Sequence, residues 1–140
     1  MALSASTLTV GDTHSERVVK DLTRTQIVQY AGASGDYMPI HTDTIFVTQV
    51  AGYPSVFAHG MLTMGLTGRM LTNYVGDARL TKFKVRFLRQ VWPGDALDVQ
   101  STVEAIRHED GEHFVDLSLE TKNQKGEVVV SGSASARIDP

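Results

Sequence analysis

The sequence predicts an α+β fold in which one long helix packs against an antiparallel sheet. Helical patterns fill the first half of the 140-residue chain, and the longest begins after His59 and runs through Tyr74. The second half alternates apolar and polar residues with a period of two, in segments separated by turn sequences. A run of helices followed by a run of strands is typical of α+β proteins, since α/β proteins alternate the two.

Composition and charge indicate one ordinary globular domain spanning residues 1–140. Apolar residues make up 41% of the chain and charged residues 21%, and the net charge of -3 gives no support to nucleic-acid binding. The absence of cysteine excludes disulfides, thiolate nucleophiles and cysteine-based zinc sites. Residues 1–10 lack the basic start and apolar run of a signal peptide, and no apolar stretch is long enough to span a membrane. We therefore expect a cytoplasmic protein.

A first helix is predicted to begin after Thr23. Gln26 lies three residues further on, which is the spacing of a capping box, where each side chain bonds the backbone of the other residue. Apolar residues follow on a helical period at Ile27, Val28, Tyr30 and Ala31. Glycines and a proline then end the pattern, at Gly32, Gly35 and Pro39. Residues 34–41 are therefore expected to form a rigid loop.

Two further helices are predicted. The shorter spans residues 43–52, and Pro54 forbids its continuation. The longer, which begins after His59, is apolar nearly all round, so we expect burial on most of its sides. It contains Gly65 and Gly68, each of which costs roughly 1 kcal/mol relative to alanine. Glycines at these positions favour the close approach of another backbone, as when a sheet wraps a helix.

Four strands are predicted after the long helix. In the first, the apolar residues Phe83, Val85 and Phe87 alternate with Lys82, Lys84 and Arg86. The same alternation continues over residues 97–105, 115–119 and 128–138, with turns at residues 110–111 and 123–126. Because each segment has one apolar face, we expect an antiparallel sheet that is covered on one side.

Asp36 and His41 are candidates for acid–base chemistry. They lie five residues apart on the loop that Gly35 and Pro39 stiffen. A carboxylate and an imidazole held in such a loop can both reach one water, and histidine can accept or donate a proton near about pH 7. The alternative is structural, with Asp36 capping a turn and His41 capping the following helix. Spacing alone is compatible with both interpretations.

His59 and Gly60 stand at the expected start of the long helix. The free N–H groups of a helix N-terminus can bind an oxyanion, and a glycine lets a substrate carbonyl approach the backbone. The alternative is a tight entry into the helix that His59 only caps. The chain lacks the G-x-S-x-G, H-E-x-x-H, Walker and G-x-G-x-x-G motifs, and its five histidines show no metal-ligand spacing. No metal site is therefore expected.

Two segments resemble the hydratase-2 signature of the MaoC-like family of (R)-specific enoyl-CoA hydratases and 3-hydroxyacyl-thioester dehydratases. They are residues 30–43, YAGASGDYMPIHTD, and residues 57–61, FAHGM. Residues 10–12 (VGD) are similar to the opening of the family, and residues 83–87 (FKVRF) and 91–95 (VWPGD) to a later strand and turn. The resemblance covers nearly the whole chain, which is most similar to small actinobacterial dehydratase subunits.

The resemblance implies a dimerising hot-dog fold, in which a sheet wraps a central helix. It also implies the reversible addition of water to a trans-2-enoyl thioester, giving an (R)-3-hydroxyacyl thioester. The acyl group would be carried on coenzyme A or acyl carrier protein, and no metal or redox cofactor would be needed. By position, Asp36 and His41 form the acid–base pair, and the backbone N–H of Gly60 is the oxyanion donor. The residues expected to contact substrate are Met38, His59, Met61, Lys84 and Arg86.

Two features qualify this assignment. Met38 stands where the family usually has asparagine, and it cannot make the hydrogen bond of that side chain to the loop. Lys84 and Arg86 belong to a basic run that also includes Arg79, Lys82 and Arg89. The run could meet coenzyme A phosphates or an acidic carrier protein, or it could be a solvated outer strand face. Two other functions stay open: a non-catalytic or partner-dependent subunit of a heterodimeric dehydratase, and an acyl-CoA-binding module.

Overall fold

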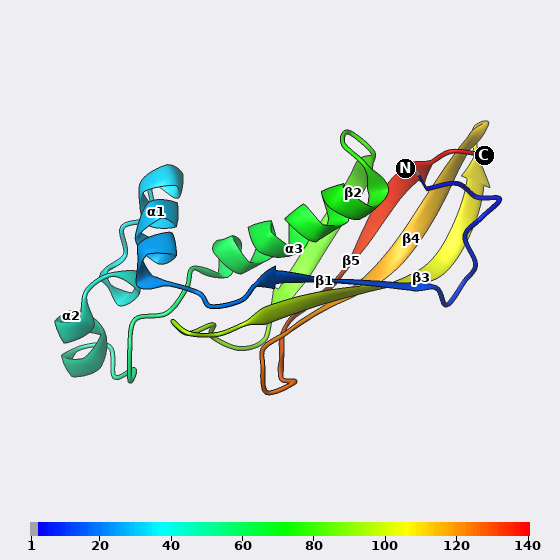
Figure 1. Ribbon diagram of the computed structural model, residues 1–140. Helices are drawn as coiled ribbons and strands as arrows, with labels where there is room; N and C mark the ends of the chain where they lie inside the picture. Colours follow the sequence, from blue (N-terminus) through cyan, green and yellow to red (C-terminus); the bar gives the residue numbers. More distant parts are fainter. Residues whose placement is uncertain (1–2) are drawn as a thin grey trace.

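Five antiparallel strands form one sheet, and the longest helix lies across one of its faces (Figure 1). This arrangement comes from a computed structural model, which describes residues 3–140. The strands are β1 (Thr13–Val19), β2 (Leu80–Phe87), β3 (Leu97–Glu109), β4 (Glu112–Lys122) and β5 (Val128–Ile138), in the sheet order β1-β3-β4-β5-β2. The helices are α1 (Arg24–Ser34), α2 (Thr44–Gln49) and α3 (Gly60–Val75), with one 3-10 turn, η1, at Pro39–His41. The predicted α+β class is confirmed.

The capping box predicted at Thr23 is present and begins α1. The Thr23 hydroxyl accepts the Gln26 N–H at 3.0 Å, and the Gln26 side chain accepts the Thr23 N–H, also at 3.0 Å. Gly35 ends the helix in the left-handed conformation with φ 74°, which a glycine adopts without strain. Gly32 lies inside the helix, so Gly35 alone acts as the predicted stop. The loop predicted at residues 34–41 is present, with η1 at its end.

The short helix α2 is present but ends before the predicted residue 52. Asp43 caps its start, because the Asp43 carboxylate accepts the Phe46 N–H at 3.0 Å. The helix ends at Gln49 and is followed by Gly52, which has φ 80°. The tight turn therefore begins earlier than Pro54.

The helix α3 occupies the predicted segment, and its expected burial on most sides is present except along one stripe. Met61, near its start, is 55% exposed. The buried face carries two threonines among its apolar residues: Thr63, Thr67, Met70, Leu71 and Val75. The Thr67 hydroxyl is satisfied by the Thr121 hydroxyl of β4 at 2.7 Å. One stripe of α3 is therefore exposed in the protomer, whereas its other sides are at least partly buried.

The glycines inside α3 do not mark the close backbone contact that their positions suggested. A β-carbon at Gly68 would lie 3.2 Å from a ring carbon of Phe83 on β2, so a side chain limits this position. A β-carbon at Gly65 would meet nothing within 4 Å. A close backbone approach occurs elsewhere, at Gly132 on β5, where a β-carbon would clash with the Lys84 carbonyl of β2.

The alternation predicted for the strands after α3 is confirmed. On β2, Phe83 and Val85 pack against the hydrophobic core, whereas the basic residues between them are exposed. Asp110 and Gly111 form the predicted two-residue turn between β3 and β4, with φ 51° and 80°. The strand β3 continues beyond the predicted residue 105 to Glu109.

The sequence pattern does not predict β1, the fifth strand. This strand pairs with β3 and lies at one edge of the sheet. Only Val18 and Val19 of its seven residues are buried, so its apolar–polar alternation is weak. An edge strand that carries polar side chains gives little periodic signal, although its backbone completes the sheet.

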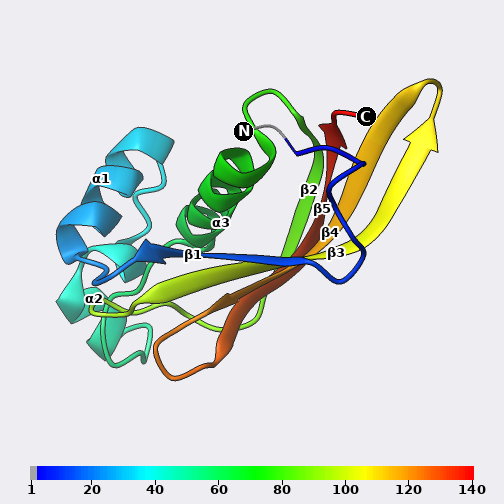
Figure 2. The same cartoon turned by 45° about the vertical axis from the view of Figure 1, so that its right-hand side comes forward.

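The helices α1 and α2 lie at one end of the sheet, and the C-terminus lies at the other end (Figure 2). Near that far end, the Ala5 N–H donates to the Asp139 carbonyl at 2.8 Å. Residues 1–2, part of the segment tested above for a signal peptide, lie outside the described residues. Within residues 3–140, no helix has the length and hydropathy that crossing a bilayer requires.

Candidate active site

Asp36 lies in the loop directly after α1, where Gly35 turns the chain. Its carboxylate accepts the Met38 N–H at 3.2 Å, so Asp36 does cap a local turn as the structural interpretation holds. Asp36 is also exposed, and this single contact leaves the carboxylate able to reach a ligand. The capping and chemical roles are therefore compatible at this residue.

His41 ends η1 and is buried, with 8% of its surface exposed. Its Nδ1 donates to the Phe57 carbonyl at 2.7 Å. Because a carbonyl oxygen only accepts, Nδ1 carries the proton and Nε2 is unprotonated in the neutral ring. The following helix α2 is capped by Asp43, not by His41. His41 therefore does not fill the capping role of the structural interpretation.

The surroundings of His41 favour its neutral form. Burial lowers the pKa of His41 below its ordinary value, and the nearby His59 lowers it further. The hydrogen bond to Phe57 and the charge of Asp36 act in the opposite direction, and the net pKa shift is downward. A neutral imidazole with an unprotonated Nε2 can accept a proton at neutral pH.

His59 directly precedes α3 and is almost wholly buried, with 2% exposed. Its Nε2 donates to the backbone carbonyl of Asp36 at 3.1 Å, and its side chain makes no capping bond. The ring stacks on His41, with centroids 3.8 Å apart and planes at 25°, and Tyr30 packs against its edge at 4.8 Å. His59 thereby ties the Asp36 loop to α3 and supports the His41 ring.

Asp36, His41 and His59 meet in space although they come from the α1 loop, η1 and the start of α3. One oxygen or ring nitrogen from each side chain lies within 4.8 Å of the other two. Gly60, as the first residue of α3, has a backbone N–H without an intrahelical acceptor. A cavity of about 460 Å³ opens here, lined by Tyr30, Ser34, Asp36, His59, Gly60, Met61 and Phe87. Groups that can move protons therefore lie beside a potential oxyanion donor.

A family profile matches this chain over most of its length. The profile, described as MaoC like domain, covers residues 6–125. The chain belongs to the MaoC-like family. One relative of this MaoC-like chain is 3-hydroxyacyl-thioester dehydratase Y of Mycobacterium tuberculosis, which is 36% identical over 89 residues, 61% of this chain and 31% of that protein. The chain thus spans about a third of the length of that relative.

Solved structures of (R)-hydratases share the fold of this MaoC-like chain. R-hydratase PhaJ1 from Pseudomonas aeruginosa is 26% identical, with a TM-score of 0.82 over 96% of this chain and 84% of that chain. The (R)-hydratase from A. caviae involved in PHA biosynthesis is 25% identical, with a TM-score of 0.83 over 97% of this chain and 100% of that chain. The predicted hot-dog fold, a central helix wrapped by an antiparallel sheet, is confirmed.

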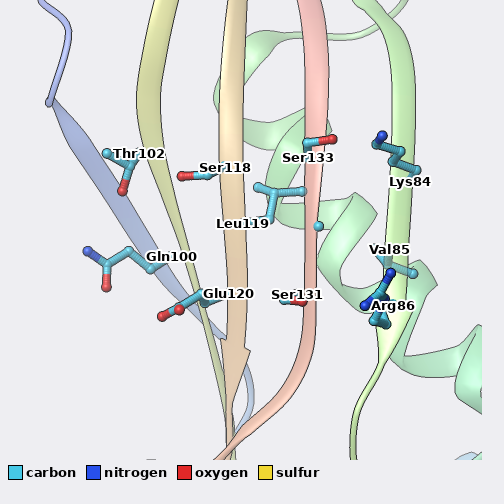
Figure 3. A pocket seen from close by; sticks show the side chains of 11 residues that line it. Lys84, Val85, Arg86, Gln100, Thr102, Ser118, Leu119, Glu120, Ser131 and Ser133 are labelled. Carbon is cyan, nitrogen blue, oxygen red and sulfur yellow. The ribbon is translucent and has the colours of Figure 1, made fainter.

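Lys84 and Arg86 do not line the cavity beside Asp36, so any contact with a substrate carrier would lie away from the acid–base pair. Their side chains lie on the sheet face opposite α3. In Figure 3 these side chains are in front of the strands and the helix is behind them. Successive residues of a strand point to opposite faces, and Phe87 takes the inner face beside Gly60. Both basic residues line a separate polar trough of about 690 Å³, together with Ser118, Glu120, Ser131 and Ser133. In the protomer these two residues form the outer strand face.

The predicted methionines differ in their placement. Met61 borders the cavity and is 55% exposed, so it is open to a substrate. Met38 is 48% exposed on the Asp36 loop but is not among the residues lining this cavity. The backbone N–H of Met38, not its thioether, bonds the Asp36 carboxylate. The turn is therefore held at this position without the usual asparagine side chain.

Sequence reasoning missed several residues of the site. Phe57 supplies the carbonyl that orients His41, and Tyr30 packs on His59. A second groove of about 270 Å³ at Gly60 includes Phe57, Gly60, Thr63, Phe87, Leu88 and Arg89. Arg89 is thus the member of the basic run that lies nearest the start of α3. Tyr30, Phe57 and Phe87 lie in the segments that resemble the family, but no pattern in the sequence gave them a role, because contacts between residues far apart along the chain place them at the site.

Proposed function

We propose that this MaoC-like chain catalyses the reversible hydration of trans-2-enoyl thioesters to (R)-3-hydroxyacyl thioesters. The observation that carries the proposal is that the Asp36 carboxylate lies close to the neutral His41 imidazole, beside a cavity lined by Asp36 and by Gly60, the first residue of α3. The family membership and the (R)-hydratase structures support this reaction and its stereochemistry. The acyl group would be delivered on coenzyme A or acyl carrier protein. No metal or redox cofactor takes part in the proposed chemistry.

The arrangement matches the needs of the reaction. His41 Nε2 accepts a proton from a water that the Asp36 carboxylate orients, and the hydroxyl oxygen bonds to C3 of the enoyl group. The electron pair of the C2–C3 double bond moves toward the thioester oxygen, where the Gly60 N–H stabilises the negative charge. The proton taken from water is then delivered to C2, which restores the neutral imidazole. Dehydration follows the same steps in reverse.

We expect Asp36→Asn and His41→Ala each to lower kcat by at least about a hundredfold, the usual scale of general acid–base catalysis. Asp36 is exposed, so its replacement should leave the melting temperature nearly unchanged. The measurement is the loss of enoyl-thioester ultraviolet absorbance with crotonyl-CoA and longer homologues.

Matched control variants lie on the hairpin between β3 and β4. Asp110→Asn and His108→Ala change the same residue types at the tip of this hairpin, far along the strands from α1, and should turn over at the wild-type rate. Near-normal turnover of both site variants would disprove the proposal. Loss of turnover in the hairpin variants would show that the assay reports on folding rather than on the site.

A partner-dependent subunit is a second candidate function. Met61, Phe87 and Leu88 are 55%, 49% and 49% exposed beside the cavity, and such apolar side chains favour a second subunit that covers them. An isolated chain that binds the thioester without turnover, and becomes active when a second subunit is added, would indicate this function. Binding without turnover under all conditions would indicate an acyl-CoA-binding module. Localisation in the cytoplasm remains a prediction from the sequence.

A further inference from the structure

The cluster of Asp36, His41 and His59 has the composition of a metal site. Two imidazoles and one carboxylate are ligands that Zn²⁺ and related divalent ions accept, and one donor atom from each lies within 4.8 Å of the others. The spacing of these residues along the chain matches no metal motif. They are brought together by the hydrogen bond between His59 and the Asp36 carbonyl and by the stacking of the two rings.

Both imidazoles are already arranged as metal ligands usually are. Metal-bound histidines almost always donate their second ring N–H to a carboxylate, a backbone carbonyl or water. His41 donates Nδ1–H to the Phe57 carbonyl, and His59 donates Nε2–H to the Asp36 carbonyl. Each ring therefore keeps one unprotonated nitrogen, which is the form that binds a metal.

The unprotonated nitrogen of His59 is an independent sign of a ligand. Nδ1 of His59 is buried and has no hydrogen-bond partner among residues 3–140. A buried acceptor without a partner costs roughly 1–3 kcal/mol, so such atoms are rare in folded proteins. Proton transfer by His41 and Asp36 makes no use of this atom. A cation bound in the cluster would satisfy it.

To bind one ion, the ligand atoms of Asp36, His41 and His59 must move closer together. A tetrahedral ion holds nitrogen and oxygen ligands at about 2.0–2.2 Å, which places the ligand atoms roughly 3.4 Å apart. Asp36 can supply this movement, because within residues 3–140 its exposed carboxylate is held by the Met38 N–H alone, at 3.2 Å. The His41 and His59 rings are stacked at 25°, so binding also requires them to tilt apart until their in-plane lone pairs point at one ion.

We propose that Asp36, His41 and His59 bind one divalent transition-metal ion, of the class of Zn²⁺ and Co²⁺, and that the bound ion blocks the active site. The ion would take the Nε2 lone pair of His41 and the carboxylate of Asp36, the two groups that the proposed hydration needs. Binding and turnover would then exclude each other. The inhibitory part of the inference rests on the proposed function, whereas the binding part does not.

The test is the titration of metal-free protein with Co²⁺, followed by its visible absorption. We expect one Co²⁺ per chain, displacement by Zn²⁺, and an affinity that falls at least about tenfold in Asp36→Asn and in His59→Ala, since even outer-shell partners act on this scale. The Asp36→Asn variant keeps the test decisive if His59→Ala fails to fold, because Asp36 is exposed. The same titration with crotonyl-CoA present should show weakened Co²⁺ binding.

The control is the double variant His108→Ala, His113→Ala. These two residues form another close histidine pair, with ring centroids 4.5 Å apart on the β3–β4 hairpin, and their removal should leave Co²⁺ affinity unchanged. The inference is overturned if wild-type protein binds no Co²⁺, if the hairpin variant loses it, or if both site variants retain it. Turnover without Co²⁺ binding would reject this inference alone, and Co²⁺ binding without turnover would reject the proposed function alone.

Discussion

At the residue scale, the site depends on which ring nitrogen carries a proton. The Phe57 carbonyl sets the tautomer of His41, and the Asp36 carbonyl sets that of His59. Asp36 therefore takes part twice, through its carboxylate beside the cavity and through its backbone carbonyl. His59 acts through Asp36 and His41, so we regard it as a positioning residue in the proposed hydration.

The lowered pKa of His41 predicts the pH dependence of the enzyme. Burial is its main cause, and it favours the unprotonated ring that the reaction needs. We expect kcat/KM to be at its maximum above the ordinary histidine pKa of about 6.5. It should fall only as the pH drops through the lower pKa that His41 has in the folded protein. A pH profile of kcat/KM, with an NMR titration of the His41 ring, measures this.

The same pKa shift makes the free energy of unfolding depend on pH. The pKa of His41 is lower in the folded chain than in the unfolded chain. At pH values between these two pKa values, the unfolded chain therefore binds more protons. The stabilisation from neutral His41 is therefore present above about pH 6.5 and is lost as the pH falls toward the folded pKa.

For the pH profile of activity, a fall in kcat/KM that begins at or above about pH 6.5, with a matching titration of the His41 ring, would contradict the assignment of His41.

At the element scale, the two glycines inside α3 should respond differently to alanine. Gly65→Ala should raise the free energy of unfolding by up to about 1 kcal/mol, because its β-carbon meets nothing within 4 Å and alanine favours helix. Gly68→Ala should gain less or lose stability, because its β-carbon lies 3.2 Å from the Phe83 ring. Urea unfolding of both variants against wild type gives the comparison.

A double variant tests whether the Phe83 ring causes the smaller stabilisation expected of Gly68→Ala. In a Phe83→Leu background, Gly68→Ala should raise the free energy of unfolding by part of the amount expected from the helix preference of alanine. The comparison is with Phe83→Leu alone. Equal stabilisation by Gly65→Ala and Gly68→Ala would mean that the Phe83 ring moves aside at no cost. The packing of α3 on β2 would then be looser than the contacts in the structure indicate.

At the scale of the whole molecule, we expect the chain to form a dimer. The strand β2 ends the sheet order, so one of its edges is unpaired, and Leu88 just beyond it is 49% exposed. Unpaired edges and exposed apolar residues favour association, and the resemblance implies that two such sheets join edge to edge. Sedimentation equilibrium should show two chains, and Leu88→Asp should weaken their association.

The matched control for the dimer is Val10→Asp. Val10 is 59% exposed, like Leu88, but it lies in the segment before β1, toward the opposite edge of the sheet. This variant should remain a dimer. A stable and active monomer of the wild-type chain would refute the prediction, while a dimer without turnover would favour the partner-dependent function.

Local patterns were enough to predict most of the elements. The capping box at Thr23, the start of α3 after His59 and the alternation of β2 all depend on residues a few positions apart. The strand β1 could not be found in this way, because its edge position leaves most of its side chains exposed. The position of the exposed stripe on α3 was also not predicted, since hydropathy does not reveal which side of a helix lacks a partner.

The sequence by itself determined the fold class, the candidate pair Asp36 and His41, and the helix start at Gly60, since short-range patterns and motifs encode these features. Only the tertiary structure decided that His59 stacks on His41 and bonds the Asp36 loop, and that Lys84 faces away from the cavity. The physical reason is that ring tautomers, burial and the facing of side chains depend on contacts between residues far apart along the chain. Such contacts leave no periodic signal in the sequence.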